Sequence, residues 1–121
     1  MNVSVDSVLQ AALKGLGLRQ QVTANNVANA DTPGYKARTV NFEQELRWAM
    51  AHAPNSRSLQ EEVTPKVTLT SNRVGRMDGN SVDMDQELLL MTETAMRYSA
   101  VARAISSRLA LYNAVVTDGR G

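Results

Sequence analysis

The segment that decides the fold of this chain is ANNVANADTPGYKAR, residues 24–38. It begins inside an apolar-periodic stretch that is typical of a helix, and it then turns sharply. Thr32 precedes a proline and is therefore biased toward an extended backbone. Pro33 fixes φ, and Gly34 can supply the positive φ that a type II turn requires at its third position. The segment therefore predicts a helix that leads into a rigid elbow, with residues 31–41 forming a loop.

Three asparagines, Asn25, Asn26 and Asn29, lie within five residues just before this elbow. Asparagine is a poor helix former because its side-chain amide competes for backbone hydrogen bonds. A helix that carries three of them near its end is expected to use their amides against a neighbouring surface.

A long N-terminal helix is predicted over residues 5–30. One line of residues with helical spacing is apolar except for a single threonine, and it consists of Val5, Leu9, Ala12, Leu16, Thr23 and Ala30. Gly15 and Gly17 each cost about 1 kcal/mol relative to alanine in a helix interior. They are points of local weakness, or places where another segment approaches the backbone closely, or a site that stays loose until neighbours clamp it.

A second long helix is predicted over residues 83–117. Asp83 is a suitable N-cap, and Asp85 and Glu87 suit the positive end of the helix dipole. A heptad seam without any charged residue runs along the helix and is typical of coiled-coil packing. The seam consists of Met84, Leu88, Met91, Ala95, Tyr98, Ala102, Ile105, Leu109, Tyr112 and Val116. A second apolar stripe runs beside it, so this helix needs partners on two sides.

The segment between the long helices is less regular. Residues 42–50 predict a short helix, and residues 51–62 are interpreted as a flexible loop. Val67 and Leu69 alternate with threonines, which indicates a short strand or hairpin arm. Residues 51–82 as a whole are therefore expected to be irregular or weakly β. The predicted fold is mainly α: a single domain, residues 1–121, whose long N- and C-terminal helices pair as a coiled coil.

Composition excludes several classes of function. The formal net charge is +1 with interspersed signs, so no basic block indicates nucleic-acid binding. There is no cysteine and a single histidine, His52, in the predicted loop. We therefore predict no catalytic residue, no cofactor and no metal site. No apolar run approaches the length of a membrane span, so direct membrane insertion is not expected. An ordinary alanine-rich three-helix bundle would have a similar composition.

Three segments, in order along the chain, resemble the flagellar rod, hook and hook–filament axial proteins. The first is the run Ala-Asp-Thr-Pro-Gly-Tyr at residues 30–35 with the asparagines before it. The second is GNSVDMDQE, residues 79–87, and the third is the C-terminal helix with Tyr98 and Leu109. Within this family, the elbow and the lack of a large inserted domain are most similar to proximal rod subunits. The resemblance does not extend over residues 51–75.

The resemblance implies a structural subunit of the proximal rod of the flagellar basal body, not an enzyme. It implies assembly into a helical tube that transmits torque and surrounds the export channel. The implied partners are copies of the same chain, other rod subunits, the MS-ring protein with its rod adapter protein, and the flagellar type III export apparatus. The implied location is the rod that crosses the periplasm, which such subunits reach without a cleaved signal peptide.

Under this interpretation, amphipathic helices that exceed what one small domain can bury pair with neighbouring subunits. The predicted packing seam is the heptad line above together with Leu9 and Leu16 of the N-terminal helix. The predicted interface elbow, wedged between subunits, consists of Asn25, Asn26, Asn29, Asp31, Thr32, Pro33, Gly34 and Tyr35. The alternatives are another axial rod subunit and a soluble helical type III secretion chaperone. The near-neutral charge and the elbow argue against a chaperone.

Overall fold

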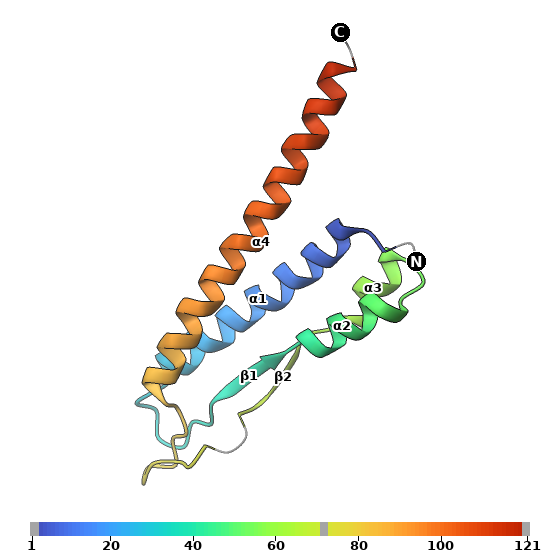
Figure 1. Cartoon of the computed structure of the whole chain (residues 1–121). Coiled ribbons are helices and arrows are strands. Elements are labelled where there is room, and N and C mark those ends of the chain that lie inside the picture. Colours follow the sequence, from blue (N-terminus) through green and yellow to red (C-terminus); the bar gives the residue numbers. More distant parts are fainter. Residues whose placement is uncertain (1–2, 71–72, 120–121) are drawn as a thin grey trace.

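The computed structural model describes residues 3–70 and 73–119. The elements follow the chain in the order α1 (Val5–Ala28), β1 (Arg38–Asn41), α2 (Glu43–His52), α3 (Ser56–Glu62), β2 (Lys66–Leu69) and α4 (Met84–Asp118). The prediction of a mainly α fold with two long terminal helices is confirmed. In Figure 1, α4 runs antiparallel to α1, and its C-terminal end extends well beyond the start of α1.

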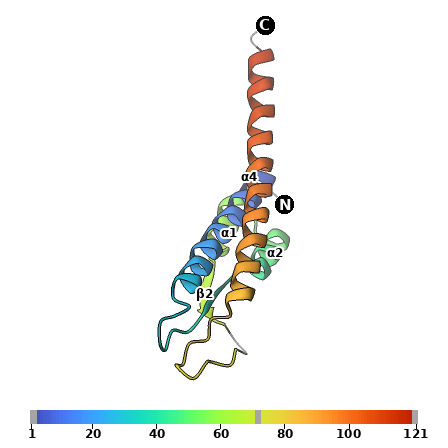
Figure 2. The same ribbon diagram turned by 90° about the vertical axis from the view of Figure 1, so that its left-hand side faces the viewer.

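Helix α1 occupies the centre of the fold. It contacts α4 on one side, and β1, α2 and α3 on the other (Figures 1 and 2). The Ser4 side chain caps its start by accepting a hydrogen bond from the Ser7 N–H at 3.2 Å. The helix ends at Ala28 rather than at residue 30, because the chain turns at Asn29, where φ is −104°. With 24 residues, α1 is about 36 Å long, whereas the 35 residues of α4 span about 52 Å.

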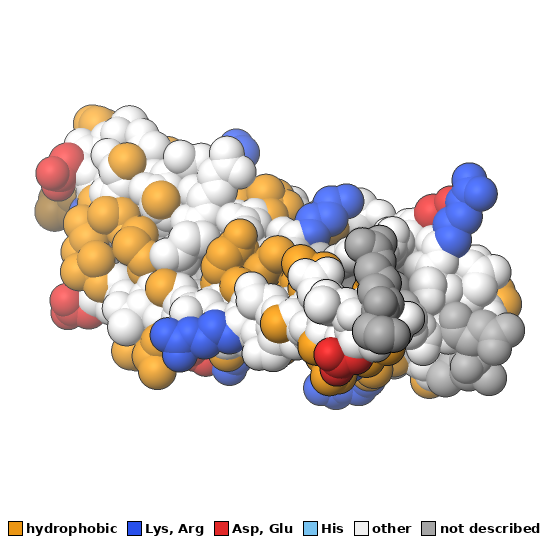
Figure 3. Space-filling view, turned by 90° about the horizontal axis from the view of Figure 1, so that it is seen from above, with side chains coloured by type: hydrophobic (Ala, Val, Ile, Leu, Met, Phe, Trp, Pro, Cys, Tyr) orange, Lys and Arg blue, Asp and Glu red, His pale blue; other side chains and the backbone are white. Residues whose placement is uncertain are grey.

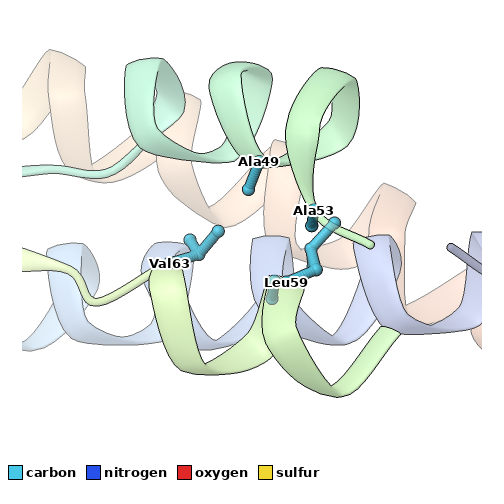
Figure 4. Packing of buried hydrophobic residues seen from close by; sticks show 5 residues of the cluster. Ala49, Ala53, Leu59 and Val63 are labelled. Carbon is cyan, nitrogen blue, oxygen red and sulfur yellow. The ribbon is translucent and has the colours of Figure 1, made fainter. Parts of the chain in front are cut away.

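The expectation of a flexible loop over residues 51–62 is wrong, because α3 forms there. Asn55 caps α3 by accepting a hydrogen bond from the Ser58 N–H at 2.9 Å. Leu59 is fully buried in a cluster that joins α1, α2 and α3, which consists of Ala11, Ala49, Ala53, Leu59 and Val63 (Figure 4). A helix of seven residues with one apolar side chain lacks a local signal. Its formation depends on the small residues that receive that side chain.

The two short strands form an antiparallel pair in which Arg38 is opposite Leu69 and Asn41 is opposite Lys66. β2 lies in the segment for which a strand was expected, although its partner differs from a local hairpin because α2 and α3 separate the two strands. β1 occupies the end of the predicted 31–41 loop, which is therefore a loop only up to residue 37. Val40 is buried against α1, and this contact fixes the register.

A second cluster explains one of the two glycines in α1. Phe42 is buried with Leu16, Val22 and Val40, and its ring lies against the backbone of α1 at Gly15. A Cβ atom at Gly15 would lie 2.5 Å from the ring, whereas one at Gly17 would lie 3.6 Å from the Tyr98 ring. Close approach is therefore the reason for Gly15, and nothing in the packing requires Gly17.

We expect Gly15→Ala to destabilise the chain by about 1–3 kcal/mol, because the buried ring has to move. Gly17→Ala is the matched control. It is expected to stabilise the folded chain by up to about 1 kcal/mol, since the added methyl group makes only an ordinary van der Waals contact. Chemical denaturation followed by circular dichroism measures both. Equal effects of the two substitutions would contradict the packing of Phe42 on α1.

A partly buried ion pair anchors α1 to the β1–α2 junction. Arg19 lies 2.5 Å from the Glu43 carboxylate, donates to the Val40 carbonyl at 2.8 Å and lies over the Phe42 ring. Burial acts to raise the pKa of Glu43, but the hydrogen bonds and charge of Arg19, with backbone N–H donors, outweigh it and leave that pKa lowered. The pair therefore stays ionised at neutral pH and fixes α2 relative to α1.

Candidate functional site

The elbow after α1 has the geometry that the Pro–Gly pair predicts. The Tyr35 N–H donates to the Thr32 carbonyl at 3.2 Å, which closes a four-residue turn with Pro33 and Gly34 at its centre. Gly34 has φ of +76°, as the third position of a type II turn requires. The Asn29 side chain donates to the Asn25 carbonyl at 2.8 Å and so covers the end of α1. The elbow is a hydrogen-bonded element, not a slack connection.

The predicted elbow residues separate into two groups. Asn25, Asp31, Thr32, Pro33 and Gly34 are exposed and form its outer side, and Asn29 is partly buried. Asn26 and Tyr35 turn inward instead, against other parts of the same chain. For those two residues, the neighbouring surface that their polar groups meet lies within the subunit. Contact between the outer group and a second subunit stays a prediction.

Asn26 is the centre of a buried polar network and is only 1% exposed. Its Nδ2 donates to the Arg38 carbonyl at 2.7 Å and to Glu87 Oε2 at 3.1 Å. Its Oδ1 accepts from the Tyr35 hydroxyl at 3.0 Å and from the Arg38 N–H at 3.1 Å. One amide thus joins α1, the elbow, β1 and the first turns of α4. This is why an asparagine, despite its poor helix propensity, occupies this position in α1.

Glu87 completes the network with a charge. Its side chain is only 2% exposed and lies 2.6 Å from the guanidinium of Arg73, whose side chain is 16% exposed. The sequence suggested for Glu87 only a general role at the start of a helix dipole. The structure shows instead a buried carboxylate paired across 14 residues, in the connection that precedes α4. Glu87 lies in the second segment that resembles the family, residues 79–87, but this resemblance did not identify Arg73 as its partner.

Asn80 is a further residue whose role the sequence did not reveal. Its side chain is fully buried, and its Nδ2 donates to the carbonyls of Asn29, Ala30 and Thr32 at 2.8–3.1 Å. Its Oδ1 accepts from the Val82 N–H at 2.8 Å. The end of α1 is therefore held by a side chain about 50 residues away along the chain. The first two segments that resemble the family, residues 30–35 and 79–87, thus form one structural unit.

We expect Gly34→Val to destabilise the chain by about 1–2 kcal/mol, because a β-branched residue is strained at positive φ. Gly34→Asn is the matched control, since asparagine tolerates this conformation. Ala37→Val is a poor control, because Ala37 is buried with Ala30 and Val82. Chemical denaturation measures the effect, and equal stability of Gly34→Val and the parent would contradict the turn.

The same pair tests the predicted wedge. Nothing lies within 4 Å of a Cβ atom built at Gly34, so Gly34→Asn adds bulk only to the outer side of the elbow. If the elbow lies between subunits, Gly34→Asn is expected to reduce assembly while leaving the stability of the monomer nearly unchanged. Normal assembly of Gly34→Asn would place the outer side of the elbow in solvent.

The predicted seam of α4 is only partly directed at α1. The line that faces α1 consists of residues seven apart, namely Glu87, Thr94, Val101 and Arg108. Among the seam residues, Met91, Ala102 and Ile105 are partly buried beside this line, and Tyr98 lies against Gly17. Counting apolar residues does not identify the line that faces α1, because two of its four residues are charged and a third is a threonine. In α1, Leu16 is buried and Leu9 is partly buried.

The remaining seam residues are exposed within this chain, although the Tyr112 hydroxyl reaches Asp6 of α1. They are Met84, Leu88, Ala95, Leu109, Tyr112 and Val116. Leu109 and Val116 are 58% and 60% exposed. Figure 3 views the molecule from the C-terminal side of α4 and shows patches of hydrophobic side chains between scattered charged groups. The outer face of α4 is therefore available for packing against other chains.

A polar clasp joins the start of α1 to α4. Arg108 pairs with Asp6, and the Tyr112 hydroxyl donates to Asp6 Oδ2 at 2.9 Å. Hydrogen bonds from Arg108 and Tyr112 hold the pKa of the Asp6 carboxyl below its usual value. Beyond Tyr112, no hydrogen bond or ion pair joins α4 to another element in the part of the chain that the structure describes. The last turns of α4 therefore extend free of α1.

No cluster of three or more His, Cys, Asp or Glu side chains that could hold a metal ion occurs among residues 3–70 and 73–119. His52 stacks on Trp48 at 4.6 Å between ring centroids, away from the network around Asn26. In the same described ranges, no helix combines the length and apolarity needed to cross a bilayer.

Comparison with known proteins gives consistent matches. The sequence model of the family described as "Flagella basal body rod protein" matches residues 8–36, which include most of α1 and the elbow. The "Flagellar basal body rod protein FlgB" of Proteus mirabilis (strain HI4320) is 34% identical, over 91% of this chain and 91% of the relative. The protein of the same name from Escherichia coli (strain K12) is 32% identical, over 83% of each chain. That of Bacillus subtilis (strain 168) is 28% identical, over 93% of this chain and 92% of the relative.

Proposed function

The chain belongs to the FlgB family of flagellar basal body rod proteins, and from this premise we propose that it builds the proximal part of the rod. It is a structural subunit of the basal body rod and assembles with other components of that structure. In the proposed role, its copies form a helical tube that transmits torque and surrounds the export channel. The matches cover most of the chain and most of each relative, so the proposal concerns the whole chain.

The observation that carries the proposal is the unburied apolar end of α4. Residues 109–117 contain no charged side chain, and Leu111, Val115 and Val116 are each at least 60% exposed. Apart from Asn113 and Thr117 the segment is largely apolar, and a helix with so much apolar surface normally buries it. Among the described residues, no hydrogen bond or ion pair joins this segment to another element beyond Tyr112, so we propose that other chains cover its exposed side chains. Contacts between different faces of identical subunits do not close on themselves and generate helical filaments.

We propose specific partners within the basal body for this subunit. They are further copies of this chain, other rod subunits, the MS-ring protein with its rod adapter protein, and the flagellar type III export apparatus. The subunit would reach the rod that crosses the periplasm through that apparatus, without a cleaved signal peptide. Its membership of a family of structural rod proteins supports these assignments.

We assign no enzymatic activity to the chain. The buried network of Asn26, Glu87 and Arg73 is fully engaged in joining elements of the fold. Its carboxylate is 2% exposed and paired, so it does not face a substrate. The polar groups of the site are therefore structural in this proposal.

Localisation tests the proposed function. In cells that lack the chromosomal gene, an epitope-tagged copy is expected to restore swimming and to co-purify with detergent-extracted basal bodies. A chain found only in the soluble fraction, bound to an export substrate, would instead support the type III chaperone alternative. A chain found in distal rather than proximal rod fragments would indicate another axial subunit.

Hydrogen exchange on the isolated chain provides a second test. The sequence alone predicts fast exchange before residue 30 and after residue 84. Because α1 packs on both sides, we now expect slow exchange in its central turns and fast exchange in residues 109–118 of α4. Protection of residues 109–118 is expected to rise on assembly. Slow exchange of residues 109–118 in the monomer would contradict the proposal that this end of α4 is protected only after assembly.

A further inference from the structure

The C-terminal half of α4 is held to its own chain mainly by polar groups. In the described part of the chain, Glu87 and Thr94 are the only buried residues of α4, and both lie near its start. Val101 is the last residue of α4 that packs against one of the buried hydrophobic clusters of that part. Beyond it, every hydrogen bond and ion pair between α4 and another described element belongs to the polar clasp of Asp6, Arg108 and Tyr112.

Apolar packing beside the polar clasp is incomplete. A pocket of about 180 Å³ lies there, lined by the clasp together with Gln10 of α1 and Ile105 and Leu109 of α4. Leu109 is 58% exposed, and Val5 in the first turn of α1 is 55% exposed. Side chains that border empty space lose the dispersion contacts that close packing provides. The two helices therefore depend on the polar clasp at this end more than on apolar contact.

The start of α1 is anchored separately, on its other side. The Ser4 N–H donates to the Ser56 Oγ of α3 at 2.9 Å, and Gln60 of α3 donates to the Gln10 side chain at 2.9 Å. Val8 packs against the buried cluster that α1, α2 and α3 share. Figure 1 shows α3 beside the start of α1 and α4 continuing past it. Loss of the polar clasp is therefore expected to move α4 and leave α1 in place.

The polar clasp is open to solvent and depends on charge. The side chains of Asp6 and Arg108 are 38% and 36% exposed. Arg108 also donates to the Tyr112 hydroxyl at 2.9 Å and lies 5.7 Å from the centre of its ring. An ion pair with this exposure contributes little to global stability and is weakened by salt. A local opening, however, requires much less free energy than unfolding of the whole chain.

We propose that the polar clasp is a releasable latch that sets the direction of the free end of α4. When the latch is closed, α4 lies along α1. When it opens, residues 102–118 swing away as a helix that pivots near Val101, while α1 stays on α3. The segment remains helical because it extends an existing helix and needs no new nucleus. This conformational change belongs to the single chain and does not rest on the proposed rod function.

Distance measurements between two spin labels test the latch in the isolated full-length chain. The chain contains no cysteine, so two introduced cysteines are labelled specifically. The reporting pair is Glu62→Cys at the end of α3 with Asn113→Cys on α4, since both positions are exposed. The reference pair is Glu62→Cys with Leu89→Cys, which lies in the anchored part of α4. Pulsed electron paramagnetic resonance measures both distance distributions.

Arg108→Gln removes the charge of the latch without changing the first turn of α1. Residues 102–118 form a lever of about 26 Å, so we expect the reporting distance to change by at least about 5 Å and to broaden. The reference distance and the circular dichroism of the chain are expected to stay unchanged. Arg97→Gln is the matched control variant, because Arg97 pairs with Glu93 of the same helix. It is expected to change neither distance.

Two results would overturn the latch. An unchanged reporting distance in Arg108→Gln would show that packing holds α4 against α1. Equal changes in the reporting and reference distances would show a general loosening of the fold and no pivot near Val101.

Salt provides an independent measurement on the parent chain. In about 1 M NaCl the Debye length falls to about 3 Å, so the exposed pair is weakened. The reporting distance of the parent is expected to shift toward that of Arg108→Gln, whereas the distance in Arg108→Gln itself stays the same. A parent chain that does not respond to salt would contradict a latch that depends on charge.

Discussion

Glu87→Ala is expected to lower the free energy of unfolding by about 3–5 kcal/mol, because it leaves the charge of Arg73 unpaired in a mostly buried site. The arginine side chain is 16% exposed, and Asn26 also loses an acceptor for its amide. Small domains are stable by only about 5–15 kcal/mol, so the loss is a large fraction of the total. Chemical denaturation followed by circular dichroism measures it.

The same helix supplies the matched control. Glu93 lies 2.6 Å from Arg97, the same distance as in the buried pair, but both side chains are more than half exposed. Glu93→Ala is expected to cost only about 0.3–0.5 kcal/mol. Replacing both buried charges, in Glu87→Leu with Arg73→Met, is expected to recover much of the lost stability. Similar small losses for the two alanine variants would show that Glu87 is solvated.

Leu109→Asp is expected to abolish incorporation into the rod while leaving the monomer folded. The side chain is 58% exposed in the single chain, so a carboxylate there remains hydrated until assembly. In a subunit contact it would be desolvated without a partner, at a cost of several kcal/mol. The measurements are swimming in complemented cells and the amount of chain in isolated basal bodies.

The control for this variant has to avoid the clasp to α1. Arg108 adjoins Leu109 but pairs with Asp6, so Arg108→Asp would bring two carboxylates together. Ser107→Asp is the better comparison, because residue 107 is exposed and lies on a different side of α4. It is expected to assemble in amounts near those of the parent. Loss of assembly for both variants to the same extent would mean that the seam through Leu109 has no special role.

The sequence determined the parts of the fold that depend on neighbours along the chain. The Pro33–Gly34 pair predicts the turn, and φ of +76° at Gly34 confirms it. Asp83 predicts the start of α4, and its side chain accepts from the Gln86 N–H at 3.3 Å. Heptad spacing predicts a long helix there. These features follow from backbone sterics, capping and periodicity, which act over a few residues.

Only the tertiary structure decided which distant groups meet. α3 has little local signal and exists because Leu59 finds a pocket lined by alanines of α1 and α2. The inward face of α4 could not be identified by counting apolar residues, since Glu87 and Arg108 lie on it. Asn26 and Glu87 are 61 residues apart, and a buried polar group is stable only where all its partners converge. Periodicity specifies that a helix has a face to bury, whereas the partner of that face is set by packing and hydrogen bonding across the whole chain.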